Sequence, residues 1–167
     1  MADAGKSLEL AGATCILICA NTMHLTIDAV REVVNIPVIH IAEATAEIII
    51  EKKLKTVALL GTKYTMEKIF YIDVLRSFGI KTIVPNLEDR NKVHRIIYDE
   101  LSKGVLNDAS KHVYLKIIKK LIKDGAEGVI LGCTEIPLLI KQTDVSVPVF
   151  DTTMIHATKS FMEALKI

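Results

Sequence analysis

Aromatic residues are scarce in this sequence, and there is no marked excess of either positive or negative charge. Phe, Tyr and Trp together make up 5% of the 167 residues, and there is no tryptophan. Lys and Arg number 21 against 20 Asp and Glu, which gives a formal net charge of +1. Proteins that bind nucleic acids neutralise phosphates with an excess of basic residues and often stack bases on aromatic rings. We therefore expect no nucleic-acid partner.

Long hydrophobic runs and cysteine frameworks are also missing. The longest apolar runs, such as residues 136–140, are far shorter than the roughly 20 residues that span a bilayer. The first ten residues are mixed and polar, unlike a signal peptide. The three cysteines, Cys15, Cys19 and Cys133, are too few and too scattered for a disulfide scaffold. These absences favour a cytoplasmic protein without a membrane partner.

The chain does contain a regular alternation of two patterns. Half of its residues are hydrophobic and 25% are charged, which is normal for a globular protein. Short, continuously apolar runs rich in β-branched residues predict strands buried on both faces of a parallel sheet. These runs cover residues 14–19, 38–41, 56–60, 81–84, 128–131 and 147–150. The segments between them have helical apolar spacing, and three of them stop before Gly79, Gly104 and Gly125. The alternation predicts an α/β fold.

An internal repeat relates the two ends of the chain. Residues 12–19 read Gly-Ala-Thr-Cys-Ile-Leu-Ile-Cys, and residues 125–133 read Gly-Ala-Glu-Gly-Val-Ile-Leu-Gly-Cys. Further on, residues 36–39 and 147–150 share an aliphatic-Pro-Val pattern. The spacing is 113 residues between the glycines, 114 between the last cysteines and 111 between the prolines. The repeat indicates two βα units related by pseudo-symmetry; the alternative is the general likeness of α/β units.

The repeat puts Cys19 and Cys133 at equivalent strand ends. The carboxyl ends of parallel strands form the ligand crevice of open α/β sheets. A thiol there lies near the amino end of the next helix, which favours the thiolate and predicts a lowered pKa for both cysteines. Inert burial is the alternative for both residues. A metal site is not expected, because the cysteines and histidines lack paired ligand spacing.

Two thiols facing each other across a crevice suit the inversion of a carbon that carries a removable proton. One thiolate removes the proton from one face, and the other thiol delivers a proton to the opposite face. Polar residues beside the cysteines are expected to bind the substrate. The candidates are Asn21, Thr22, Thr134 and Glu135. The threonines would act with backbone N–H groups on carboxylates, and Glu135 would hold an ammonium group.

These motifs resemble those of the aspartate/glutamate racemases that work without pyridoxal phosphate. Residues 19–24, Cys-Ala-Asn-Thr-Met-His, look like the first cysteine motif of the aspartate racemase branch. Residues 131–135, Leu-Gly-Cys-Thr-Glu, look like the second. Residues 60–65, Leu-Gly-Thr-Lys-Tyr-Thr, are similar to the Gly-Thr turn of the family, and residues 150–156 to its C-terminal segment. The resemblance implies inversion of the α-carbon of aspartate or a related acidic amino acid, with no cofactor.

The resemblance also implies roles for residues outside the cysteine motifs. Thr62 and Thr65 would contact the substrate, with helix capping as a compatible alternative. Lys103 would bind the distal carboxylate; complementing a helix dipole is the alternative. His24 and His156 would tune the site, and ordinary packing is the alternative for both.

The implied architecture is a homodimer of chains with two pseudo-symmetric Rossmann-like lobes, each built on a parallel sheet, and an active-site cleft between the lobes. Residues 1–50, with 152–167 packing back on them, would form a partial first lobe, and 51–151 the second. Family members usually begin with a strand and a Gly-rich loop, and a substrate-binding arginine follows. Here Cys19 comes almost at once. We expect a shortened chain with an unpaired strand edge and weaker carboxylate binding.

Two further interpretations stay open. The chain could be a truncated, non-catalytic family member. It could also be an isomerase or lyase relative in which one cysteine attacks a diacid as a nucleophile.

Overall fold

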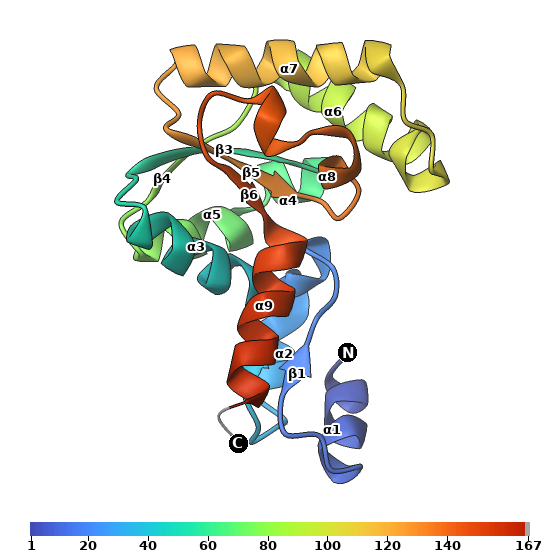
Figure 1. Cartoon of the computed structure of the whole chain (residues 1–167). Coiled ribbons are helices and arrows are strands. Elements are labelled where there is room, and N and C mark those ends of the chain that lie inside the picture. The colour runs from blue at the N-terminus through green and yellow to red at the C-terminus, as the bar shows by residue number, and fades with distance from the viewer. Residues whose placement is uncertain (166–167) are drawn as a thin grey trace.

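The computed structural model describes residues 1–165, so the last two residues of the predicted 152–167 segment lie outside it. The larger part of the molecule is built on a four-stranded sheet. It lies above a smaller part that contains the N-terminus (Figure 1). Among residues 1–165, no helix is long and apolar enough to span a membrane.

The four-stranded sheet has the order β4-β3-β5-β6, and all its pairs are parallel. Its strands are β3 (Thr56–Gly61), β4 (Lys81–Ile83), β5 (Gly128–Gly132) and β6 (Val149–Asp151). The two central strands, β3 and β5, run in register, with Gly61 opposite Gly132 at their carboxyl ends. A Cβ on Gly61 would lie 2.9 Å from the Gly132 carbonyl oxygen, so the two strand ends approach as closely as only glycine permits.

Helices cover both faces of this sheet (Figure 1). One hydrophobic cluster packs α6 (Leu87–Asp99) and α7 (Asp108–Lys123) against β3 and β5, with Tyr114 fully buried in it. A second cluster packs α3 (Ile41–Glu51) and α5 (Ile69–Ser77) on the opposite face. The continuously apolar strands therefore have buried side chains on both sides, as their sequences predict.

The smaller part is a two-stranded parallel sheet of β1 (Ile16–Leu17) and β2 (Val38–Ile39). Helices α1 (Ala2–Leu10) and α2 (Ile27–Arg31) pack with it, and the 3-10 turn η1 (Thr22–Thr26) follows β1. Its own core is small and aliphatic, and comprises Ile16, Ile18, Ile27, Val30 and Val38.

The remaining elements are short connections, apart from the C-terminal helix. They are α4 (Lys63–Glu67), η2 (Leu101–Lys103), α8 (Ile136–Leu139), η3 (Gln142–Asp144) and α9 (Thr152–Ala164). All six predicted strands are present. Gly79, Gly104 and Gly125 all have a positive φ where the preceding helix ends, as predicted.

The internal repeat has a structural counterpart. Ile16 N–H donates to the Pro37 carbonyl at 2.8 Å, and Val129 N–H donates to the Pro148 carbonyl at 2.9 Å. Each bond joins a strand that precedes a cysteine motif to the segment that leads into its parallel neighbour. A helix follows each second strand, and these helices, α3 and α9, pack against each other. The fold is thus α/β with two parallel sheets in repeated βα arrangements.

Helix α3 lies at the junction of the two parts. Its buried residues Ile41, Ala42, Ala46 and Ile49 belong to the core of the larger sheet. It is also linked to α2, because Arg31 donates to both carboxylate oxygens of Glu43, at 3.0 and 2.9 Å. The expected division at residue 50 stays a prediction, and these core contacts favour a boundary before α3.

Candidate functional site

The two motif cysteines follow equivalent parallel strands. Cys19 lies two residues after β1 and is exposed; Cys133 follows β5 directly and is half-buried. Both are free thiols, as is the half-buried Cys15. Each motif begins at the carboxyl end of its strand, where the sequence predicts ligand contacts.

Three threonine hydroxyls join the first motif to the Gly-Thr turn. Thr22 Oγ1 lies 3.3 Å from Thr62 Oγ1 and 3.4 Å from Thr65 Oγ1, and these two lie 3.2 Å apart. Thr62 also caps α4 by accepting a hydrogen bond from Thr65 N–H. The Thr65 methyl group lies against Gly132, just before Cys133. The hydroxyl cluster thus lies between the two cysteine motifs.

A second link runs through Thr152, the first residue of α9. Asn21 Nδ2 donates to Thr152 Oγ1 at 3.1 Å, and Thr152 Oγ1 donates to the Leu131 carbonyl at 2.9 Å. Since Thr152 uses its hydrogen on Leu131, the Asn21 atom that faces it must be the amide nitrogen. Asn21 Oδ1 is buried and accepts no hydrogen bond within residues 1–165. The two motifs are therefore connected by hydrogen bonds through Thr152. The connected residues are Asn21, two positions after Cys19, and Leu131, two positions before Cys133.

The Cys133 thiol is paired with a carboxylate. Cys133 Sγ donates to Glu135 Oε2 at 2.8 Å. Burial is the main cause that raises the pKa of Cys133 to about 12, and the Glu135 carboxylate acts in the same direction. Backbone N–H groups of Thr134 and Glu135 favour the thiolate, as predicted, but they are outweighed. The expected lowering of the pKa is therefore wrong for Cys133.

The neighbours of Cys133 differ in exposure. Burial disfavours the charged form of Glu135, but hydrogen bonds from Cys133 and Thr134 leave its pKa lowered overall. Thr134 itself is exposed. Tyr114, a residue that sequence reasoning missed, is buried behind this motif; burial, together with the charges of Cys133 and two glutamates, raises its pKa. Within a helical apolar stripe, nothing in the sequence separates Tyr114 from an ordinary core residue.

Both expected tuning histidines are buried and bonded to the backbone. His24 Nδ1 lies 2.9 Å from the Ala20 carbonyl oxygen, and its Nε2 accepts from Ile41 N–H at 3.1 Å. His156 Nε2 lies 2.8 Å from the Ile39 carbonyl oxygen. Both nitrogens of His24 are thus bonded to the backbone, and its predicted tuning of the site stays a prediction.

Lys103 makes no hydrogen bond to the network just described. It is exposed on η2, a turn that packs against α8, the short helix after the second motif. Its carboxylate-binding role stays a prediction. In residues 1–165, no group of three His, Cys, Asp or Glu side chains is arranged to hold a metal ion.

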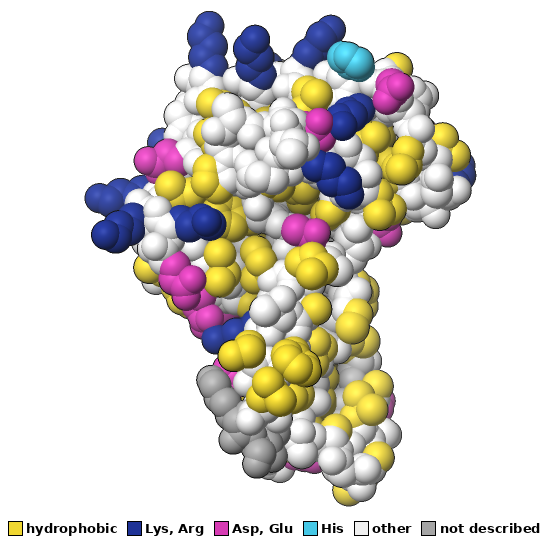
Figure 2. Space-filling model, in the orientation of Figure 1, with side chains coloured by type: hydrophobic (Ala, Val, Ile, Leu, Met, Phe, Trp, Pro, Cys, Tyr) yellow, Lys and Arg dark blue, Asp and Glu magenta, His cyan; other side chains and the backbone are white. Residues whose placement is uncertain are grey.

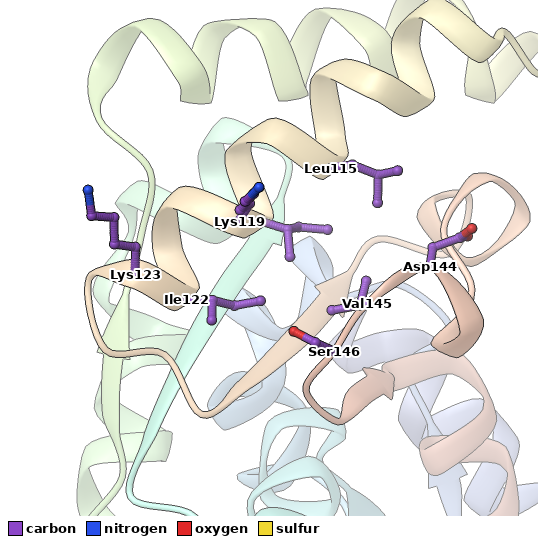
Figure 3. A pocket seen from close by; sticks show the side chains of 8 residues that line it. Leu115, Lys119, Ile122, Lys123, Asp144, Val145 and Ser146 are labelled. Atoms are coloured by element: carbon purple, nitrogen blue, oxygen red, sulfur yellow. The ribbon is translucent and has the colours of Figure 1, made fainter.

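A hollow of about 550 Å³ lies elsewhere, between α7 and the segment around η3 (Figure 3). Its walls are aliphatic, and Lys119, Lys123 and Asp144 lie at its margin. None of the predicted site residues lines it.

Comparison with known proteins gives consistent matches. The model of the Asp/Glu/hydantoin racemase family matches residues 1–159. A glutamate racemase from Hydrogenobaculum sp. is 32% identical over 142 residues, which cover 80% of this chain and 49% of that protein. The chain spans about half the length of the curated relatives it matches first.

Two crystal structures resemble the whole described fold. One is a candidate Asp/Glu racemase from Yersinia pestis, with 45% identity and a TM-score of 0.94. The other is an aspartate racemase homologue from Pyrococcus horikoshii, with 46% identity and a TM-score of 0.89. In both comparisons the match covers 98% of this chain and 72% of the other.

Proposed function

The chain belongs to the Asp/Glu/hydantoin racemase family, and from that membership we propose that it inverts the α-carbon of a small acidic amino acid, with aspartate as the first candidate. The single observation that carries this proposal is the pair of equivalent cysteine motifs joined by the Asn21–Thr152–Leu131 hydrogen bonds. The reaction uses Cys19 and Cys133 as the acid–base pair.

The different surroundings of the two thiols support separate roles in one direction of the reaction. Cys133 rests as a thiol, because burial and the Glu135 carboxylate raise its pKa to about 12. As a thiolate, Cys19 would take the α-proton and become a thiol. Cys133 would then give its proton to the opposite face of the carbanion and become the thiolate. The reverse reaction exchanges these roles, so proton and charge are conserved in each direction.

The charge that develops in this reaction needs hydrogen-bond donors. When the α-proton leaves, negative charge spreads onto the substrate α-carboxylate, and fixed donors stabilise it. The hydroxyls of Thr22, Thr62 and Thr65 supply such donors beside the first motif, and Thr134 with its backbone N–H supplies them beside the second. The buried Oδ1 of Asn21 has free acceptor capacity for an ammonium group. The Glu135 carboxylate would supply the negative charge that pairs with the ammonium group, and Lys103 would bind the distal carboxylate of the substrate.

The proposal extends to the oligomeric state and the location of the protein. Exposed apolar residues of α9, visible as a yellow region in the lower half of Figure 2, fit burial in a homodimer. These residues are Met154, Phe161 and Met162. Three free cysteines fit a reducing, cytoplasmic location.

Chiral chromatography of L-aspartate and L-glutamate after incubation with the protein tests the proposal. We expect D-enantiomer to appear with one of them, and we expect Cys19→Ser and Cys133→Ser each to abolish it. Cys15→Ser is the matched control and should retain activity, because Cys15 lies outside the bonded network. Unchanged enantiomer ratios with both substrates would overturn the proposal for this chain.

Two added measurements separate the alternatives. A covalent adduct with a diacid, seen by intact-mass spectrometry, would indicate nucleophilic chemistry instead. A rise in the melting temperature with dicarboxylic amino acids, without inversion, would indicate binding alone.

A further inference from the structure

Three histidines from distant parts of the sequence meet at the junction of the two parts. His24 is in η1, His40 lies between β2 and α3, and His156 is in α9. The His24 ring centroid lies 4.7 Å from that of His40 and 5.6 Å from that of His156. All three are buried, with exposed fractions of 1%, 4% and 4%. We call these three residues the histidine cluster.

The hydrogen bonds of His24 fix which nitrogen carries its proton. A carbonyl oxygen can only accept, so the nitrogen facing Ala20, Nδ1, must carry a hydrogen. The nitrogen facing Ile41 N–H, Nε2, must be an acceptor and carries none. His24 is therefore a neutral imidazole with both nitrogens in use.

These two bonds connect the first cysteine motif to the larger sheet. The Ala20 carbonyl belongs to the residue that directly follows Cys19. Ile41 is the first residue of α3 and is buried in the core of the four-stranded sheet. His40 adds a parallel contact, because its Nδ1 accepts from Ala42 N–H and caps the same helix. Through His24, the backbone beside an exposed thiol is attached to the start of a helix whose inner face is buried in the core.

We propose that His24 is a positioning residue that sets the conformation of the Cys19 loop relative to the Cys133 motif. The inference deepens the proposed function, because a two-thiol inversion requires both sulfurs to be held on opposite faces of one carbon. It gives His24 a role through the backbone, without contact with substrate. The role requires the neutral Nδ1–H form, since a second hydrogen on Nε2 would face Ile41 N–H.

A pair of variants separates positioning from simple core packing. His24→Asn keeps an amide donor near the place of Nδ1 for the Ala20 carbonyl but loses the acceptor for Ile41. His24→Leu fills similar space and loses both bonds. Both variants change the packing around the buried ring of His24. Only His24→Leu leaves the Ala20 carbonyl without its hydrogen-bond donor. His112→Leu, at an exposed site on α7, is the matched control.

The readout is the rate at which iodoacetamide modifies Cys19, followed by peptide mass spectrometry. We expect His24→Leu to change this rate about five- to tenfold, the factor that corresponds to loss of the Ala20 hydrogen bond. His24→Asn keeps that bond and loses only the one to Ile41, so it should change the rate by less. Equal rates in the parent and in His24→Leu would overturn the proposal, as would equal changes in both variants.

A measurement on the parent protein tests the proposal even if a variant fails to fold. Nitrogen-15 NMR of the imidazoles should show His24 at pH 7 as the neutral form with its proton on Nδ1. An Nε2–H tautomer or an imidazolium would overturn the proposal. Neither readout depends on racemisation, so the proposed function can fail while this inference stands. Where racemisation is observed, His24→Leu should lower kcat more than it raises KM.

Discussion

The side-chain amide of Asn21 and the hydroxyl of Thr152 form a buried hydrogen bond of 3.1 Å across 131 residues of sequence. The same Thr152 hydroxyl donates to the Leu131 carbonyl at 2.9 Å, so a series of two hydrogen bonds connects the two cysteine motifs. Each partner of Thr152 lies two residues from a motif cysteine. The first residue of α9 therefore links the segments that carry the two motifs.

Replacing Thr152 by valine should destabilise the protein by about 1–3 kcal/mol, since the buried Asn21 amide and Leu131 carbonyl both lose their partner. Urea unfolding measures this free energy. Thr153→Val is the matched control, because Thr153 is the next residue of α9 and is exposed. A double-mutant cycle with Asn21→Ala should give a coupling energy of about 0.5–3 kcal/mol. Additive effects of the two changes would contradict the link.

Replacing Glu135 by glutamine should lower the pKa of Cys133. Burial raises that pKa most, but the Glu135 carboxylate both accepts the S–H bond and repels the thiolate. The neutral amide removes the repulsion, so more thiolate is present at a given pH. The rate at which iodoacetamide modifies Cys133, measured between pH 7 and 10, should rise in the variant.

The control for this change is Glu51→Gln, at the exposed end of α3. It removes the same charge away from Cys133 and should leave the rate unaltered. If Glu135→Gln and Glu51→Gln give the same Cys133 profile, the carboxylate has no effect on the thiol. In that case burial alone accounts for its high pKa.

Local sequence patterns predicted the elements well, because each depends on nearby residues. The apolar runs gave the strands, and Gly125 gave the end of α7 through its left-handed conformation. The repeat gave equivalent strand ends for Cys19 and Cys133. It was confirmed by the matching hydrogen bonds to Pro37 and Pro148.

Contacts between distant segments could not be predicted in the same way. The sequence favours a low pKa at a helix start, but Cys133 packs against the core that α6 and α7 form with β3 and β5, and its burial raises the pKa. His40 carried no chemical signal in the sequence, yet it caps α3 beside His24. The repeat held a usable hint, since His40 and Asp151 occupy the same place in it and both cap the helix that follows.

Stability should fall as the pH drops from about 6.5 toward about 4, because of the histidine cluster. Burial is the main cause that lowers the pKa of His40 from 6.5 to about 4, and the nearby His24 adds to it. The facing charges of Glu43 and Arg31 act in opposite directions, and His156 also lowers the pKa. Burial likewise lowers the pKa of His24 and His156.

The direction of this change in stability with pH follows from proton binding. Between these pH values the unfolded chain binds protons that the folded cluster rejects, so acid favours unfolding. Urea unfolding at pH 7 and pH 4.5 should give a loss of about 1–3 kcal/mol that His40→Asn reduces. Asparagine retains an N-cap acceptor for Ala42 N–H but does not titrate. His112→Asn, at an exposed position, should keep the full pH dependence. A His40→Asn variant as acid-sensitive as the parent would assign the loss to other groups, because only the titration of His40 has been removed.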